Sequence, residues 1–172
     1  RRRWPAGLIL ALTSWPVPAL AQSPPEGPTE AAKALFERAT AALDRKDYDS
    51  ACPMIEEALR LQPAANGARA ALAECHEGAG KLATAWRTYV TVAEVAAAAG
   101  QSERREAARA HADSLKIRLG GVIFQVDPGT RALPGLAITW DGAAIPPDEW
   151  GKVLPADRGT HTLTATAPGK AA

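Results

Sequence analysis

Residues 47–63 read DYDSACPMIEEALRLQP, and this stretch decides the fold of the first half of the chain. Its apolar residues recur every three or four positions, the spacing that gathers side chains on one face of a helix: Ala51, Ile55, Ala58 and Leu59. We predict a helix from about Asp49 to Leu61. Gln62-Pro63 ends it, because proline has no N–H to donate and its ring clashes with the preceding turn.

The segment before this helix has the same character. It begins after Thr29, a residue type suited to capping a helix N-terminus, and contains neither Pro nor Gly before the predicted turn at residues 44–47. Its apolar positions also follow helical spacing: Leu35, Ala39, Ala42 and Leu43. The two segments therefore predict an antiparallel helical hairpin.

The hairpin pattern returns 34 residues later. Apolar positions recur as matched pairs at this offset: Ala39 with Ala73, Tyr48 with Leu82, Ala51 with Ala85, Ile55 with Tyr89, and Leu61 with Val95. A fixed period of this length is typical of stacked helical repeats. The small residues of these pairs allow close helix approach, so we expect them to be buried.

The sequence resembles the tetratricopeptide repeat family in Asp47-Tyr48-Asp49-Ser50-Ala51, followed by Ile55, Ala58 and Leu61-Gln62-Pro63. The resemblance covers about residues 32–65, with a weaker copy over 66–99. A further helix, predicted from Ser102 as a cap to about Leu119, would cover the last repeat. The resemblance implies a helical domain over residues 30–119 with about five helices; any other antiparallel helical bundle is the alternative.

Family geometry implies a binding face on the first helix of each pair. The residues that would form it are Lys33, Phe36, Thr40, Ala70, Glu74 and Glu77, with Arg104 and His111 on the last helix. We expect this face to bind a peptide or partner protein.

At Gly120-Gly121 the composition changes from Ala, Glu and Arg to Val, Ile, Thr, Gly and Pro, which predicts strands. The expected strands are residues 122–126, 136–140 and 160–167, with turns at Asp127-Pro128-Gly129 and Asp141-Gly142. In the last strand Thr alternates with His, Leu and Ala, so we expect one hydroxyl-bearing face and one buried face.

This second half resembles the envelope-associated β modules called PEGA domains, in Asp141-Gly142, Arg158-Gly159-Thr160-His161-Thr162-Leu163 and Ala167-Pro168-Gly169-Lys170. The likeness covers about residues 120–172 and implies a small β-sandwich. Such modules continue into another strand, so we expect this one to be incomplete at Ala172. The fold class expected for the whole chain is α+β, with helical hairpins followed by a small β-sandwich.

The N-terminus has a basic, apolar and small-residue order. Arg1-Arg2-Arg3 precedes an apolar run, and Ala19-Leu20-Ala21 precedes Gln22, which predicts a signal peptide over residues 1–21. A Pro-rich linker follows at 22–29. We therefore expect export to the periplasm or cell envelope. Pro16 and Pro18 interrupt the apolar run before it reaches the length of a membrane span, so we expect a signal peptide instead of a membrane anchor. No integral membrane span is expected in the mature residues.

Cys52 and Cys75 lie on either side of the predicted turn at residues 62–64, and the midpoint between them falls on that turn. Two antiparallel helices would bring them to the same height, and an exported protein meets an oxidising compartment. We expect a disulfide, with two buried thiols as the alternative.

Composition argues against several functions. Lys and Arg number 20 against 19 Asp and Glu, so the net charge of +1 gives no field for nucleic acid. His76 stands beside Cys75 without the further closely spaced ligands that zinc needs, and no phosphate loop, dinucleotide fingerprint or nucleophile motif is present. We expect no enzyme activity, cofactor or metal.

The sequence thus favours an exported, non-catalytic protein-interaction scaffold. A structural envelope component that self-assembles is one alternative. A carbohydrate-binding module for cell-wall contact is another, resting on Trp150, whose indole suits stacking on a sugar or partner side chain. Core packing is the other role considered for Trp150 and for Trp140.

Overall fold

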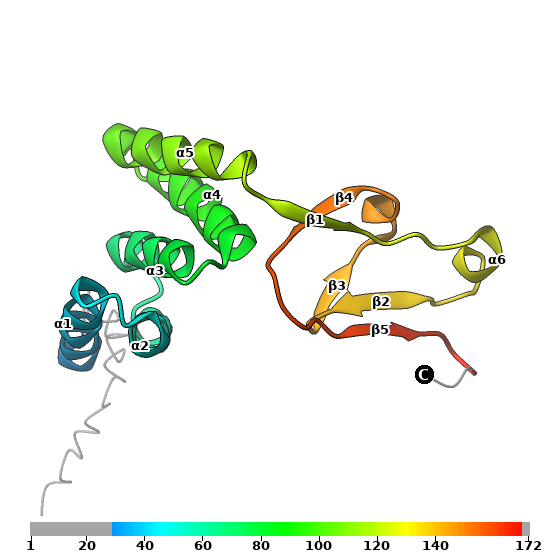
Figure 1. Cartoon of the computed structure of the whole chain (residues 1–172), viewed down its shortest axis with the longest axis horizontal. Helices are drawn as coiled ribbons and strands as arrows, with labels where there is room; N and C mark the ends of the chain where they lie inside the picture. The colour runs from blue at the N-terminus through cyan, green and yellow to red at the C-terminus, as the bar shows by residue number, and fades with distance from the viewer. Residues whose placement is uncertain (1–28, 170–172) are drawn as a thin grey trace, which may run out of the picture.

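A computed structural model describes residues 29–169 of the chain. Helices come first and two small antiparallel sheets follow, which confirms the predicted α+β class (Figure 1). The helices of the first half are α1 (Glu30–Asp44), α2 (Tyr48–Leu61), α3 (Asn66–Gly78), α4 (Leu82–Ala98) and α5 (Ser102–Lys116). The predicted signal peptide, and all but Thr29 of the predicted linker, lie outside the described residues.

Local signals set several helix ends. Thr29 Oγ1 accepts from the Ala32 N–H at 3.1 Å, as predicted, and Asp47 Oδ1 accepts from the Ser50 N–H at 3.2 Å. Gly80 and Gly100 have positive φ values of 77° and 68° directly after α3 and α4, a conformation that glycine adopts without strain. Ser102 does not cap α5, so that prediction was wrong. Gln101 occupies the cap position, and no side chain forms a hydrogen bond there.

The helices pack around two apolar clusters, one formed by α1, α2 and α3 and the other by α3, α4 and α5. The four predicted small residues are fully buried: Ala39, Ala51, Ala73 and Ala85. Ile55 and Tyr89, the paired larger residues, are buried beside them. Burial of the four small residues is what the 34-residue period predicted.

The disulfide is confirmed. Cys52 of α2 and Cys75 of α3 are bonded, with their Cα atoms 5.7 Å apart. The bond closes a loop of 23 positions that contains the α2–α3 turn, so it fixes the second and third helices together.

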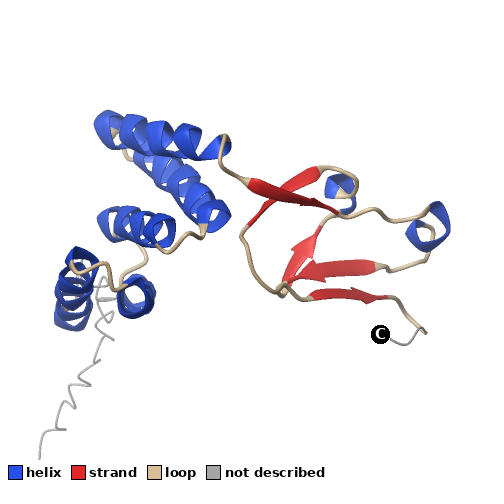
Figure 2. Ribbon diagram, viewed as in Figure 1, coloured by secondary structure: helices blue, strands red, loops and turns tan. Residues whose placement is uncertain are grey.

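The β half contains two sheets. β1 (Gly120–Ile123) pairs with β4 (Val153–Ala156), while β2 (Ala137–Trp140) pairs with both β3 (Ala143–Ile145) and β5 (Leu163–Thr166) (Figure 2). A one-turn helix α6 (Pro128–Arg131) and a 3-10 turn η1 (Pro147–Glu149) lie in the connections. Phe124, Ile138, Ile145 and Trp150 form the buried core that the two sheets share.

The Asp141-Gly142 turn is confirmed as a hairpin. Both residues have positive φ, 48° and 80°, and they join β2 to β3. This two-residue turn matches the twist of antiparallel strands, which explains why the sequence signal was reliable.

Two strand predictions need correction. The first strand covers residues 120–123 instead of 122–126, and Asp127 does not form the predicted turn, because it caps α6 through the Thr130 N–H at 3.0 Å. The last strand is exposed along its whole length, with Leu163 59% exposed, so the expected buried face is absent. β5 is an edge strand, and none of its residues belongs to the shared core.

Within residues 29–169, the helices are too short or too polar to cross a bilayer.

Candidate functional site

The residues of the predicted binding face lie on α1, α3 and α5. They do not form one continuous cluster of contacts. Lys33 and Phe36 line an apolar cavity at one end of the bundle, whereas Glu77 and His111 both contact Tyr89 of α4.

The apolar cavity has a volume of about 340 Å³. Its walls come from three helices and the α2–α3 turn: Ala32, Lys33 and Phe36 from α1, Ala58 from α2, Gln62 and Ala65 from the turn, and Gly67 and Ala68 from α3. Small side chains create the space, and the half-buried ring of Phe36 forms its largest apolar wall. A cavity of this size and lining suits one apolar side chain of a ligand.

The second group surrounds Tyr89. The His111 ring stacks on the Tyr89 ring with centroids 4.7 Å apart, and the Tyr89 hydroxyl donates to Glu77 at 3.5 Å. Arg118, which follows α5, forms an ion pair with Glu77 at 3.0 Å. Burial, followed by the charges of Glu77 and Glu74, raises the pKa of Tyr89, so its hydroxyl stays protonated.

The remaining residues of the predicted face show mainly local contacts. Thr40 donates to the Phe36 carbonyl of its own helix, Arg104 donates to Gln101 at 2.6 Å, and Lys33 pairs with Glu30 at 3.0 Å. Ala70 packs against the helical core, and Glu74 is exposed. Exposed pairs of this kind contribute little to stability, so their side chains are free to exchange partners.

His76 is a buried polar residue that sequence patterns did not single out as important. Its side chain is 7% exposed, its Nδ1 has no hydrogen-bond partner among the described residues, and its Nε2 lies 3.8 Å from Glu56. Burial lowers the pKa of His76, with Glu56 opposing that effect. The imidazole is therefore neutral in the folded protein near pH 7.

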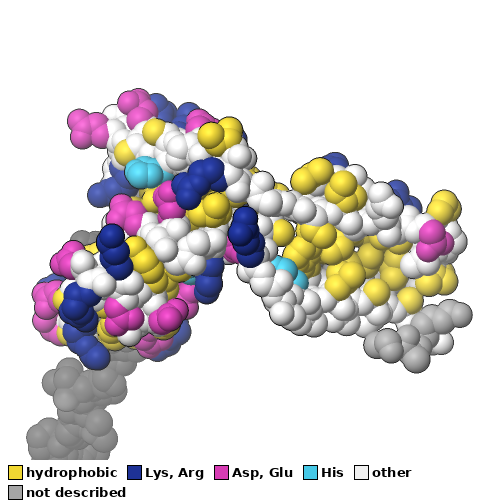
Figure 3. Space-filling view, in the orientation of Figure 1, with side chains coloured by type: hydrophobic (Ala, Val, Ile, Leu, Met, Phe, Trp, Pro, Cys, Tyr) yellow, Lys and Arg dark blue, Asp and Glu magenta, His cyan; other side chains and the backbone are white. Residues whose placement is uncertain are grey.

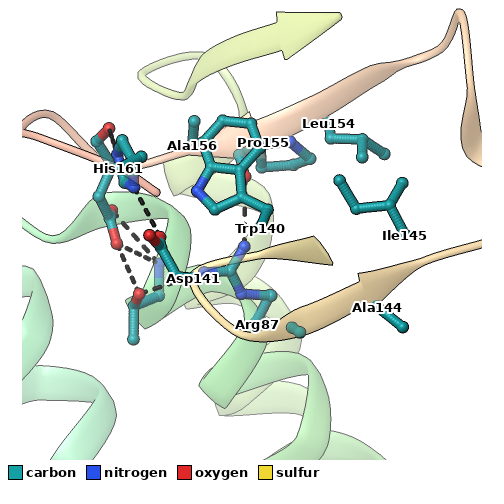
Figure 4. Close-up of a pocket in the computed structure, with 12 residues that line it drawn as sticks. Arg87, Trp140, Asp141, Ala144, Ile145, Leu154, Pro155, Ala156 and His161 are labelled. Atoms are coloured by element: carbon teal, nitrogen blue, oxygen red, sulfur yellow. Dashed lines mark hydrogen bonds and ion pairs between the residues drawn. The ribbon is translucent and has the colours of Figure 1, made fainter. Parts of the chain in front are cut away.

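A second constellation lies where the β half meets α4. The α4 N-terminus has Lys81 at the cap position, which offers no side-chain acceptor. Asp157, directly after β4, takes that role: its carboxylate accepts from the N–H groups of Ala83 and Thr84, at 2.6 and 3.2 Å, and from the Thr84 hydroxyl at 2.5 Å (Figure 4). An acidic group at a helix N-terminus satisfies unpaired N–H groups and favours the helix dipole.

His161 lies beside this cap. Its Nδ1 is 2.7 Å from Asp141 Oδ2, and its Nε2 is 3.0 Å from the Asp157 carbonyl oxygen. The Asp141 contact, followed by the Asp157 carbonyl, raises the pKa of His161. The pKa of Asp141 is lowered, first by the Thr162 N–H that donates to it and then by His161.

These residues border a cavity of about 380 Å³ between α4 and the β half, which Figure 4 draws in close-up. The Trp140 ring lies against the His161 ring, with centroids 4.9 Å apart. Arg87 of α4 spans the same cavity and donates to the Pro155 carbonyl at 3.2 Å. The polar groups that line this cavity already bond to one another. Their hydrogen bonds connect α4 with the β half.

Trp150 does not offer a stacking surface. Its side chain is part of the β core, 8% exposed, and its Nε1 donates to the Ile145 carbonyl at 3.1 Å. Arg131 lies over the ring at 5.5 Å from its centroid. The core-packing role applies, because a buried and already covered indole ring cannot stack on a sugar.

Comparison with protein-family models finds no matching family, and comparison with curated proteins finds no matching relative.

Sequence reasoning missed the junction residues Arg87, Asp157 and His161. Asp157 bonds to residues 73 and 74 positions away, a separation that leaves no periodic trace in the sequence. The residues around His161 show only the pattern of a strand and a family likeness, and neither predicts the contact of His161 with Asp141.

Proposed function

We propose that this protein is a non-catalytic, exported protein-interaction scaffold of the cell envelope, and that its helical half binds a segment of a partner protein. The observation that supports this proposal is the apolar cavity beside Phe36, open at the surface between α1 and α3. An apolar side chain of the partner enters this cavity. Lys33 and Gln62 at its border bond to the partner backbone or to an acidic neighbour.

Rigidity supports the same proposal. The Cys52–Cys75 disulfide fixes α2 to α3, and both helices contribute walls to the cavity. A site held in its binding shape loses less conformational entropy when it binds, so even a small contact area gives measurable affinity. The disulfide also supports export, because such bonds persist in oxidising compartments.

The test starts from a displayed peptide library selected on the folded protein, followed by titration of one selected peptide. Two variants alter the cavity in opposite ways. Phe36→Ala removes its largest apolar wall. Gly67→Leu adds a large side chain to the cavity lining, at a position where an added Cβ atom meets no neighbouring atom within 4 Å. We expect each to weaken binding by about tenfold or more, the loss typical of a central contact.

Arg38→Ala is the matched control, because Arg38 is exposed on the same helix and does not border the cavity. It should retain full affinity. Circular dichroism must show unchanged helicity in all three variants. Equal affinity of the parent protein and the Gly67→Leu variant would place the peptide elsewhere and refute the proposal.

Self-association is the second candidate function, and one observation favours it. Ile123 and Val153 are cross-strand partners on the β1–β4 sheet and are 46% and 67% exposed. Figure 3 shows that charged side chains gather over the helices, whereas the visible face of the β half has few charged side chains and several apolar patches. If the β half joins copies of the chain, the mass in solution rises with concentration, and Val153→Lys abolishes that rise.

A further inference from the structure

His161 is held between two hydrogen-bond acceptors. Its Nδ1 faces the Asp141 carboxylate and its Nε2 faces the Asp157 carbonyl oxygen, and neither oxygen carries a hydrogen to donate when Asp141 is ionised. A neutral imidazole has one N–H group and one lone pair. Only the doubly protonated, cationic ring can donate to both acceptors at once.

These two contacts join three separate segments of the β half. Asp141 lies in the β2–β3 turn, Asp157 follows β4, and His161 precedes β5. The Asp157 carboxylate continues the connection into the helical half, because it caps the first turn of α4. His161 thus contacts the backbone carbonyl of Asp157, the same residue whose carboxylate bonds to α4.

We propose that His161 is a pH-sensitive latch, which fixes the β half against the N-terminus of α4 when its imidazole is doubly protonated and loosens that junction when the ring is neutral. This inference goes beyond the proposed binding function and does not depend on it. The latch controls the orientation of the β half relative to the helices.

The charges around the ring favour its cationic form. Two carboxylates face it, Asp141 from the β2–β3 turn and Asp157 from the segment after β4. Two guanidinium groups lie on neighbouring segments. Arg87 of α4 borders the same cavity as His161 and donates to the Pro155 carbonyl and the Thr84 hydroxyl, and Arg158 is the residue after Asp157. His76 of α3 also lies within electrostatic range of Asp157.

The direction of the effect follows from the raised pKa of His161. The latch is complete below the ordinary histidine pKa of 6.5, where the ring is charged in both the folded and unfolded chain. Its contribution is lost as the pH rises through the higher pKa of the folded state. One acceptor then faces a lone pair of the ring, which repels it.

The experiment measures orientation and protonation in the same full chain. Spin labels are attached through non-natural residues at Glu94 of α4 and Thr164 of β5, both exposed, and the distance distribution is recorded from pH 5 to pH 8.5. Nitrogen-15 shifts of the imidazole follow His161 itself. We expect a narrow distribution at low pH that broadens as the ring loses its proton, with amide exchange at Ala83 and Thr84 rising about tenfold.

Variants separate the latch from other titrations. His161→Phe should give a broad distribution at every pH, and Asp141→Asn, which preserves the turn and one acceptor, should move the transition to lower pH. His111→Gln and His76→Gln should keep the parent transition. A distribution that stays unchanged while the His161 shifts report deprotonation would overturn the proposal, as would a distribution that stays narrow from pH 5 to pH 8.5 in both His161→Phe and Asp141→Asn.

Discussion

Two glycines of α3 have opposite surroundings. A Cβ atom added at Gly78 would overlap the ring of Tyr48, whereas one added at Gly67 meets nothing within 4 Å. Alanine favours a helix over glycine by up to about 1 kcal/mol, so propensity alone predicts the same gain at both positions. Packing reverses that prediction at Gly78.

We expect Gly78→Ala to lower the free energy of unfolding by about 1–2 kcal/mol, because Tyr48 must leave its place in the helical core. Gly67→Ala, the matched control, should raise it by a few tenths to about 1 kcal/mol. Urea unfolding followed by circular dichroism measures both. A stabilised Gly78→Ala variant would mean that the Tyr48 ring does not rest on α3.

His76 makes the helical half sensitive to acid. Burial lowers its pKa in the folded protein below the ordinary 6.5, so the unfolded chain binds more protons as the pH falls below that value. Stability contributed by neutral His76 is therefore present at pH 7 and is lost on acidification. The pH dependence of stability contributed by His76 is therefore opposite in sign to that contributed by His161.

The corresponding measurement is the urea midpoint from pH 7.5 to pH 5. The parent midpoint should fall with pH, and His76→Leu should flatten that dependence, because the leucine binds no proton in either state. His111→Gln, altered at an exposed histidine, should keep the parent slope. An unchanged slope in His76→Leu would show that other groups cause the acid sensitivity.

At the scale of single elements, the disulfide is the main covalent constraint. It closes a 23-position loop between α2 and α3, for which chain entropy predicts about 3 kcal/mol of stabilisation. We expect the double variant Cys52→Ser, Cys75→Ser to lose about that amount in urea unfolding.

Reductant separates the bond from the side chains. It should lower the midpoint of the parent protein and leave the double variant unaffected. Equal midpoints for oxidised and reduced parent protein would contradict a stabilising role for the bond.

Local elements could be predicted where a local signal exists. Four signals depend only on neighbouring residues or one turn: the helix periodicity, the Thr29 cap, the Asp141-Gly142 hairpin and the position of the cysteines on either side of a turn. Strand partners could not be predicted this way. β1 pairs with β4, about 30 positions later, and no residue near Gly120 encodes that choice.

Contacts between residues far apart in the sequence could not be predicted either. The Asp157 cap and the His161 contacts depend on how the β half lies against α4. An aspartate and a histidine in loops do not by themselves predict such contacts. The burial of Trp150 could not be predicted for the same reason. Its position in a predicted loop indicated a ligand contact, but its side chain packs in the β core.

In the whole molecule, the two halves have unequal cores. The helices bury two clusters, while the β half buries one cluster of four large residues, and its strands are only three or four residues long. Because stability scales with buried apolar area, the β half should unfold first on heating.

Tryptophan fluorescence can follow the β half separately. In a chain that starts at Gln22 and carries Trp86→Phe, Trp140 and Trp150 are the remaining tryptophans. Their thermal midpoint should lie on the order of 5 °C or more below the midpoint from helical circular dichroism. Coincident midpoints would indicate one cooperative unit instead.

The Asp157 cap also has a consequence for biogenesis. A chain made or exported from its N-terminus presents α4 more than 70 residues before Asp157 arrives. Until then the first turn of α4 has no side-chain acceptor for its N–H groups, so it frays while α1 to α3 can already pack. Contacts between distant residues form late. Completion of α4 therefore waits for the β half, and interrupted synthesis would leave the helical half with one incomplete helix end.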